Sequence, residues 1–269
     1  MGVSYRYQSL EDFLISAPLT IDAQFDDGWG ARFPVKGREI EATVVFADIT
    51  AFSARARDLT PEQTLFFVNN FFAWIAAEAL RGGSGIVDKY IGDELMIVFS
   101  REFGSEDPFV DALHAARSIA QNDAHSYCPH IGLASGPVIV GYVGTPLKYN
   151  CSVFGAPVAL AARCAGVLPQ DDAGYVSSSI VFPASEWDDR DFDAVFPPNR
   201  LRDPDGTIIE QPHGWELLSP RDVELKNLGT IPLREIVHRT FHFPSQPAEE
   251  RAKEGIADYR AHARGHSSG

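Results

Sequence analysis

The sequence contains little cysteine, few positive charges and no long apolar segment. Its three cysteines, Cys128, Cys151 and Cys164, have no paired metal-binding spacing, so we expect reduced thiols in a cytoplasmic protein. No apolar run is long enough to cross a bilayer. The N-terminus shows no basic segment followed by an apolar core, so we expect neither a signal peptide nor a membrane partner.

Positive charge is scarce, because 23 Lys and Arg residues stand against 37 Asp and Glu residues, for a formal net charge of −14. An acidic chain repels the phosphates of nucleic acids and anionic membranes, so we expect neither as a nonspecific partner. A nucleotide site remains compatible with this charge, since it needs only a local basic cluster and a metal ion. The hydrophobic content of 45% is typical of a soluble globular protein.

One strand–helix–strand unit organises the rest of the chain. Apolar runs at residues 42–46 and 95–99 predict two buried strands. Between them, Thr60, Pro61 and Gln63 predict a helix start with an N-cap, a proline at the first helical position and a capping box. The apolar stripe expected along this helix consists of Leu65, Val68, Phe72, Ile75 and Ala79.

Each of these two expected strands has an aspartate at one end. Asp48 follows the first strand, and Asp93 lies in a Gly-Asp turn just before the second. Carboxylate oxygens at the ends of adjacent strands suit hard divalent cations, which could activate a hydroxyl group and stabilise a leaving phosphate. On spacing alone, both residues could instead serve only to form turns.

Four further elements can be predicted downstream. Asp107 and Pro108 indicate the start of a second amphipathic helix. Residues 131–144 predict two strands joined by a Ser-Gly-Pro turn. Pro157 can open an Ala-rich helix, and residues 222–237 are typical of a strand, a turn and a strand.

The outer regions have less regular patterns. Residues 1–39 are interpreted as an N-terminal extension that packs on the core, with a short helix at 10–15. Residues 171–221 indicate an ordered insertion, with a short helix near 180–187, because its aromatic side chains argue against disorder. Residues 244–269 form a polar C-terminal tail.

Several motifs, in the family's order, resemble those of class III nucleotidyl cyclases. Residues 46–53, Phe-Ala-Asp-Ile-Thr-Ala-Phe-Ser, are similar to the F-x-D-I-x-x-F-[ST] segment of that family. Residues 89–93, Lys-Tyr-Ile-Gly-Asp, are similar to its K-x-x-G-D turn. Residues 131–144, 148–163 and 222–229 resemble the strand, helix and lysine segments that follow in the family.

The resemblance implies a fold and an assembly. The expected fold class is α+β: a ferredoxin-like βαββαβ cyclase catalytic domain at residues 40–243, with the N-terminal wrap and the insertion before the last strands. Active sites in this family lie between two such domains, so the single domain here implies a homodimer. The substrate would be a nucleoside triphosphate, and two Mn²⁺ or Mg²⁺ ions would bind at each site.

The resemblance also assigns roles to residues. Asp48 and Asp93, with the Ile49 carbonyl, would hold the metal ions. Arg163 would stabilise the transition state, and Lys226 would bind the triphosphate. The expected nucleotide-binding residues are Phe46, Thr50, Ala51, Phe52, Ser53, Lys89, Tyr90, Ser152 and Phe154.

The identity of the base depends on a few of these positions. Lys89 goes with adenine in the family, yet a lysine is a pure donor and can equally serve a carbonyl of uracil or cytosine. Ser152 stands where adenylyl cyclases place a base-contacting Asp or Thr, and its hydroxyl can donate or accept. Tyr90 and Phe154 are bulky enough to shrink the pocket to fit a single ring. Ala159 stands where the family places a catalytic Asn, so an inactive nucleotide-binding dimer remains an alternative.

A closer resemblance concerns residues 88–94 and 148–159, which are similar to the pyrimidine cyclases of the bacterial anti-phage Pycsar system. It implies conversion of UTP to 3′,5′-cyclic UMP and pyrophosphate, as a second messenger in anti-phage defence that a separate effector protein would read. Formation of cyclic CMP from CTP, adenylate cyclase activity and an inactive cyclase-like dimer remain alternatives.

Overall fold

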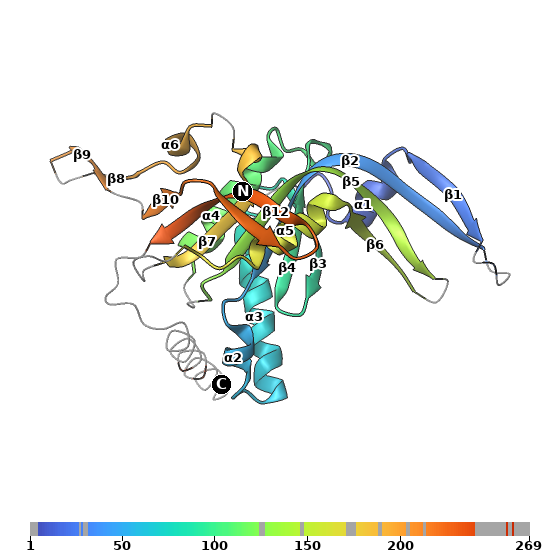
Figure 1. Cartoon of the computed structure of the whole chain (residues 1–269), viewed down its shortest axis with the longest axis horizontal. Helices are drawn as coiled ribbons and strands as arrows, with labels where there is room; N and C mark the ends of the chain where they lie inside the picture. Colours follow the sequence, from blue (N-terminus) through green and yellow to red (C-terminus); the bar gives the residue numbers. More distant parts are fainter. Residues whose placement is uncertain are drawn as a thin grey trace.

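A computed structural model describes residues 5–26, 28, 32–123, 127–145, 148–170, 176–187, 190–202, 205–211, 214–239, 257 and 260 (Figure 1). The helices are α1 Leu10–Ser16, α2 Phe52–Ala56, α3 Pro61–Ala79, α4 Pro108–Gln121, α5 Ala156–Ala165 and α6 Phe192–Val195, with 3₁₀ turns η1 Arg101–Phe103 and η2 Ala184–Glu186. The strands are β1 Ile21–Asp26, β2 Arg32–Asp48, β3 Gly85–Ile91, β4 Glu94–Phe99, β5 His130–Thr145, β6 Lys148–Phe154, β7 Val176–Pro183, β8 Asn199–Arg202, β9 Ile208–Gln211, β10 Trp215–Leu217, β11 Arg221–Leu225 and β12 Gly229–Arg239.

One large sheet forms the framework, with the strand order β10-β12-β7-β5-β2-β4-β3. Its part β5-β2-β4-β3 is entirely antiparallel and joins the chain order β2-α3-β3-β4-α4-β5. This is the βαββαβ arrangement, so the expected ferredoxin-like α+β fold is confirmed. β7 continues the sheet beyond β5, to which it runs parallel, and β12 pairs with β7.

The central strand β2 is buried on both faces, which explains its continuous apolar run. Alternate residues of a strand point to opposite faces, so Val45 and Ala47 join the core beneath α3 and α4. Val44 and Phe46 join a second core on the other face, together with side chains from α1 and α5. The paired strands β1–β2 and β5–β6 extend away from α3 and α4 as long ribbons, with α1 lying beside them (Figure 1).

Helix α3 begins as its sequence predicts, and four of the five residues of its expected stripe, Val68, Phe72, Ile75 and Ala79, join the core or pack against it. Thr60 accepts a hydrogen bond from the Gln63 N–H while the Gln63 side chain accepts one from the Thr60 N–H, so the capping box is present. The expected stripe, however, is wrong at its first position, because Leu65 is 63% exposed. Phe67 and Phe71 face the core instead, since turning these two aromatic rings inward buries more apolar surface.

The hairpin expected within residues 131–144 is wrong, since β5 is one continuous strand. Pro137 pairs with Glu41 of β2, and the strand passes through Gly136 without reversing. Proline is tolerated because β7 pairs with β5 only up to Gly132 and β6 only from Ile139 onwards, so no strand needs the missing N–H. The reversal lies after Thr145, where β5 turns back into β6.

The insertion expected at residues 171–221 begins with a strand of the main sheet. The short helix expected near 180–187 is wrong, because β7 occupies Val176–Pro183 and only a 3₁₀ turn follows. A strand buried on both faces shows neither the alternation of a half-buried strand nor the period of a helix, so the sequence pattern did not predict β7. Further along, Trp187, Phe196 and Trp215 pack into the main core, so the expectation of order holds for them.

The remaining expectations concern the ends of the chain. α1 begins at Leu10 as predicted and packs on the sheet through Phe13 and Leu14. β2 starts at Arg32, so the end of the N-terminal extension belongs to the central strand. Almost all of the tail at 244–269 lies outside the described residues. All three cysteines are buried and free of disulfides, and no helix of the described chain is long and apolar enough to cross a membrane.

Candidate active site

Asp48 and Asp93 meet at one end of the central strands. Asp48 is the last residue of β2 and lies directly opposite Glu94 of β4. Asp93 lies in the two-residue turn between β3 and β4, where Gly92 takes a φ of +63°, a conformation that favours glycine. The sheet register therefore collects three carboxyl groups, of which the sequence predicted two.

The electrostatics of this end are strongly negative. Burial, a hydrogen bond to Asp93 and the charges of Asp93 and Glu94 raise the pKa of Asp48 to about 8. Burial and the charge of Asp93 also raise the pKa of Glu94, while the charge of Arg163 lowers it. Such shifts are typical of a site in which carboxylates are held together for a cation.

The donors at this end fit a divalent cation. Oδ1 of Asp48 is buried and makes no hydrogen bond within the described chain, so it is an acceptor in need of a partner. Both carboxylates and the Ile49 carbonyl are hard oxygen ligands. The described residues include no group of three or more His, Cys, Asp or Glu side chains arranged as a complete metal cage. Mg²⁺ sites commonly use one or two carboxylates and take their other ligands from water and substrate phosphates.

The loop after β2 is tied to the chain before β5. Ala51 has a left-handed conformation with φ 55°, and α2 starts directly after it. Thr50 donates its N–H to the Tyr127 carbonyl and its hydroxyl to the Cys128 carbonyl, so neither donor is available to a phosphate in this structure. The Phe52 N–H is donated to the Ile49 carbonyl. Within the described chain, the N–H groups of Ala51 and Ser53 donate to no backbone carbonyl outside the helices and strands.

The predicted aromatic residues of this segment point into the protein. Phe46 is 3% exposed and belongs to the second core, while Phe52 stacks on Phe67 of α3 at 6.3 Å between ring centroids. Arg55, which the sequence did not single out, is 1% exposed. Its Nε donates to the Thr50 carbonyl over 2.9 Å and its Nη2 to the Tyr127 carbonyl over 3.3 Å, which fixes the loop from inside.

Of the residues expected to read the base, Lys89, Ser152 and Phe154 come together from β3 and β6, whereas Tyr90 lies on the other face of the sheet. The Lys89 Nζ lies 5.8 Å above the ring of Phe154. Tyr90 packs against Phe72 of α3 at 4.4 Å between ring centroids and leaves 51% of its surface exposed. Ser152 is buried, and its hydroxyl lies 2.7 Å from the carboxylate of Asp88, a residue the sequence interpretation missed. The sequence shows that Asp88 precedes Lys89, but it does not show the direction in which the Asp88 side chain points.

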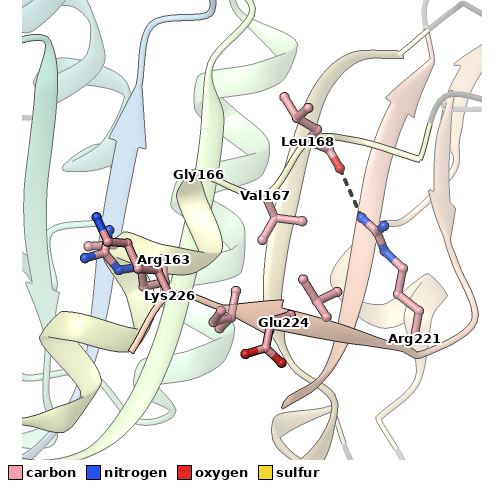
Figure 2. A pocket seen from close by; sticks show the side chains of 10 residues that line it. Arg163, Gly166, Val167, Leu168, Arg221, Glu224 and Lys226 are labelled. Atoms are coloured by element: carbon pink, nitrogen blue, oxygen red, sulfur yellow. Dashed lines mark hydrogen bonds between the residues drawn. The ribbon is translucent and has the colours of Figure 1, made fainter. Parts of the chain in front are cut away.

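Arg163 and Lys226 line a common pocket of about 420 Å³ between α5 and β11. Figure 2 shows them beside one another at one end of it, with Arg221 at the other end donating a hydrogen bond to the Leu168 carbonyl over 3.0 Å. Lys226 follows β11 directly, and Asn227 takes a left-handed φ of +67° in the turn, as expected. The two carboxylates Asp48 and Asp93 are absent from the lining of this pocket.

The site residues thus form three groups on one chain: a carboxylate end, a base-reading cluster and a cationic pocket. The sequence profile of the adenylate and guanylate cyclase catalytic domain matches residues 35–170, half of the chain, and spans the first two groups and Arg163. The chain belongs to this family. Lys226 lies beyond the matched residues of the cyclase domain.

Comparison with known proteins agrees with membership of the cyclase family. An adenylate cyclase of Anabaena cylindrica is 31% identical over 143 residues, which cover 48% of this chain and 27% of that protein. An uncharacterized protein of Mycobacterium tuberculosis, Rv1318c, is 30% identical over 162 residues, or 59% of this chain and 30% of that protein. The cyclase chain therefore spans less than a third of the length of these curated relatives.

Solved cyclase structures share the fold. A bacterial light-regulated adenylyl cyclase superposes with a TM-score of 0.54 at 20% identity, covering 82% of this chain and 58% of that one. The adenylyl cyclase CyaB of P. aeruginosa gives 0.54 at 16% identity over 77% of this chain and 99% of that one. The guanylyl cyclase Cya2 superposes with a TM-score of 0.51 at 18% identity, covering 78% of this chain and 98% of that one.

Proposed function

We propose that the chain is a metal-dependent nucleotidyl cyclase that works as a homodimer on a pyrimidine nucleoside triphosphate, with UTP preferred. The observation that carries the proposal is that Asp48 and Asp93 do not line the pocket that Arg163 and Lys226 share, although Arg163 is close enough for its charge to act on Glu94. Asp48 and Asp93 form a negative end with an unsatisfied acceptor, while Arg163 and Lys226 line a cationic pocket that excludes both carboxylates. Two chains related by a two-fold axis would join these two half-sites, one from each chain, twice.

Each group has a defined part in the proposed reaction. Divalent ions held by Asp48, Asp93 and the Ile49 carbonyl would acidify the ribose 3′-hydroxyl and neutralise charge at the α-phosphate. The 3′-oxygen forms a bond to the α-phosphorus and gives its proton to water, while the bond between the α-phosphorus and the oxygen bridging to the β-phosphate breaks and releases pyrophosphate. Arg163 donates to the α-phosphate, and Lys226 pairs with the leaving pyrophosphate.

The loop after β2 binds the remaining phosphates in this proposal. The N–H groups of Ala51 and Ser53 are next to the carboxylate end and, within the described chain, donate to no backbone carbonyl outside the helices and strands. Neighbouring amides of this kind form a concave anion site. Ala159 is exposed on α5 one turn before Arg163, so no amide side chain assists the ribose there.

A pyrimidine substrate is supported by the surroundings of Lys89. Phe154, 41% exposed, lies 5.8 Å from its ammonium group and favours a small base, whereas Tyr90 packs against Phe72 of α3 on the other face of the sheet. The resemblance of residues 88–94 and 148–159 to the Pycsar cyclases supports UTP first and CTP second. It also supports a role in anti-phage defence, in which a separate effector protein would read cyclic UMP.

Adenylate cyclase activity is the second candidate. Lys89 is the residue that accompanies adenine in the family, and the adenylate cyclase of Anabaena cylindrica is 31% identical over the matched region. The two candidates differ only in the base that fits beside Lys89, since the phosphate chemistry is common to both.

The test is product analysis by mass spectrometry after purified protein is incubated with each ribonucleoside triphosphate and Mn²⁺. We expect cyclic UMP, or cyclic CMP, to dominate, and Asp93→Asn to abolish it. Dominant cyclic AMP would support the second candidate. An intact dimer that forms no cyclic product from any of the four substrates would contradict cyclase activity. The defence role is tested separately, by cyclic UMP accumulation in phage-infected cells that carry the gene.

A further inference from the structure

We propose that Asp88 is a positioning residue that sets the base preference of the site, by holding Lys89 in place and by fixing the direction of the Ser152 hydroxyl. The inference rests on the proposed function only in assuming that Lys89 and Ser152 face the nucleotide base. The side chains of Asp88 and Ser152 are both buried in the single chain, and of the two only Ser152 occupies a position that the family resemblance assigns to the base.

A β-bulge gives Asp88 this position. In the β3–β4 ladder Val87 pairs with Ile97 and Lys89 with Met96, so one extra residue, Asp88, lies between two consecutive partners. Without the bulge, Val87 and Lys89 would share a face of the sheet, because residues two apart do so. The bulge turns Lys89 away from the core that holds Val87 and directs Asp88 towards β6.

One oxygen of Asp88 connects the whole cluster. Oδ2 lies 2.7 Å from the Ser152 Oγ, 3.4 Å from the Val153 N and 3.4 Å from the Lys89 Nζ. Oδ1 is buried and has no hydrogen-bond partner within the described residues. Asp88 therefore depends on the donors at Oδ2, and Lys89 and Ser152 are joined through a single atom.

The contacts fix which group donates. An oxygen that accepts from a backbone N–H and lies beside an ammonium group is an ionised acceptor, so the Ser152 hydroxyl must donate its proton to Asp88. Burial, the largest effect, raises the pKa of Asp88 above its ordinary value, and the hydrogen bond from Ser152 and the charge of Lys89 offset part of this rise.

The consequence is a fixed hydrogen-bond pattern for the base. The Ser152 hydroxyl already donates its only proton to Asp88, so it can only accept a hydrogen bond from the base, while Lys89 can only donate. The matching base edge presents an N–H group beside an acceptor, as uracil and guanine do with a ring N–H and a carbonyl, and cytosine and adenine with an amino group and a ring nitrogen, so the spacing of the two groups sets which base fits. If Asp88 loses its charge, Ser152 is free to donate, and Lys89 loses the anion that holds it beside Phe154.

The experiment measures binding, so that it does not depend on catalysis. Dissociation constants are determined for the four 3′-deoxyribonucleoside triphosphates, which lack the attacking hydroxyl, with wild type, Asp88→Asn, Ser152→Ala and the double variant. Asp22→Asn, an exposed aspartate on β1, is the control for loss of one charge. We expect Asp88→Asn to reduce the preference for the best base at least about tenfold, and the control to leave it unchanged.

The double variant separates orientation from general damage. If Asp88 acts through Ser152, the shift in base preference in Asp88→Asn/Ser152→Ala is smaller than the product of the two single shifts. An unchanged preference in folded Asp88→Asn overturns the inference, as does a wild type that binds all four bases equally. Should Asp88→Asn fail to fold, Ser152→Ala decides, because an unchanged preference there also overturns it. Selective binding without any cyclic product would defeat the proposed function and leave this inference standing.

Discussion

Asp48 and Glu94 lie directly opposite one another on β2 and β4, so the central strand ends against a second carboxyl group, with Asp93 in the adjoining turn. The sheet register, which the core packing determines, thus places negative charge where a cation can relieve it. The carboxylate end is a consequence of the fold, and its effect on the stability of the metal-free protein can be measured.

The first prediction concerns the pH dependence of stability without metal. Folded Asp48 keeps its proton up to about pH 8, whereas in the unfolded chain it loses it near its ordinary value of 3.8. The folded state therefore binds more protons between these values, and the free energy of unfolding falls as the pH rises through this interval. Asp48→Asn has no such proton, so its melting temperature in EDTA should depend less on pH between about pH 5 and pH 8.

Metal addition gives the companion measurement. Mn²⁺ should raise the melting temperature of the wild type, and more at about pH 8 than at about pH 6, because protons compete for the same oxygens. Asp48→Asn should lose most of this rise. Parallel melting curves for wild type and variant, with and without Mn²⁺, would show that Asp48 does not form a metal site.

The second prediction concerns Arg55. Replacing it by Met leaves the half-buried Thr50 carbonyl without its Nε donor, which costs about 1–3 kcal/mol of stability. The loop that carries Ala51 and Ser53 loses its anchor, and cyclase turnover should fall on the order of 10²-fold even well below the melting temperature. Arg57→Met, on an exposed arginine two residues further along, is the matched control and should behave like wild type. Equal turnover in the two variants would contradict the role of Arg55.

The third prediction concerns the contact that positions Arg163. Gly132 of β5 lies against the backbone of α5, and a Cβ atom built there would come within 2.1 Å of the Ala161 carbonyl oxygen. Gly132→Ala must displace the helix that carries Arg163, at a cost of about 1–3 kcal/mol or more. Thermal unfolding measures this loss. Gly82→Ala, where a Cβ meets nothing within 4 Å, should change the melting temperature little, and similar losses in both would contradict the close packing.

Local signals explain which parts of the fold the sequence could predict. Thr60 and Gln63 form the predicted capping box, Asp107 caps α4 as expected, and Asn227 takes the left-handed turn conformation. Each of these depends on side chains a few residues apart. The pairing of Asp48 with Asp93 was also predictable, because both lie at the ends of strongly apolar strands.

The failures share a different cause. Gly136 and Pro137 resemble a turn locally, but pairing with β2 holds β5 straight through them. β7 has no periodicity because both of its faces are buried. Asp88 was missed because a β-bulge depends on how two strands align, which no single segment reveals. The neighbours of these residues come from distant parts of the chain, so the sequence around them does not determine their structure.

The fourth prediction tests the cationic pocket. Arg163→Ala and Lys226→Ala should each lower kcat by about 10²–10³, as for comparable donors to a developing charge. Both side chains are exposed, so their melting temperatures should stay close to that of wild type. A change in KM alone would mean that these residues bind the nucleotide without stabilising the transition state.

The most direct test of the composite site is complementation between two inactive variants. Asp93→Ala removes the carboxylate half-site and Arg163→Ala the cationic one, so each homodimer should be inactive. In an equal mixture, half of the dimers are heterodimers with one intact site of two, and about one quarter of wild-type activity should return. No recovery, although differently tagged subunits confirm that heterodimers form, would contradict an active site shared between two chains.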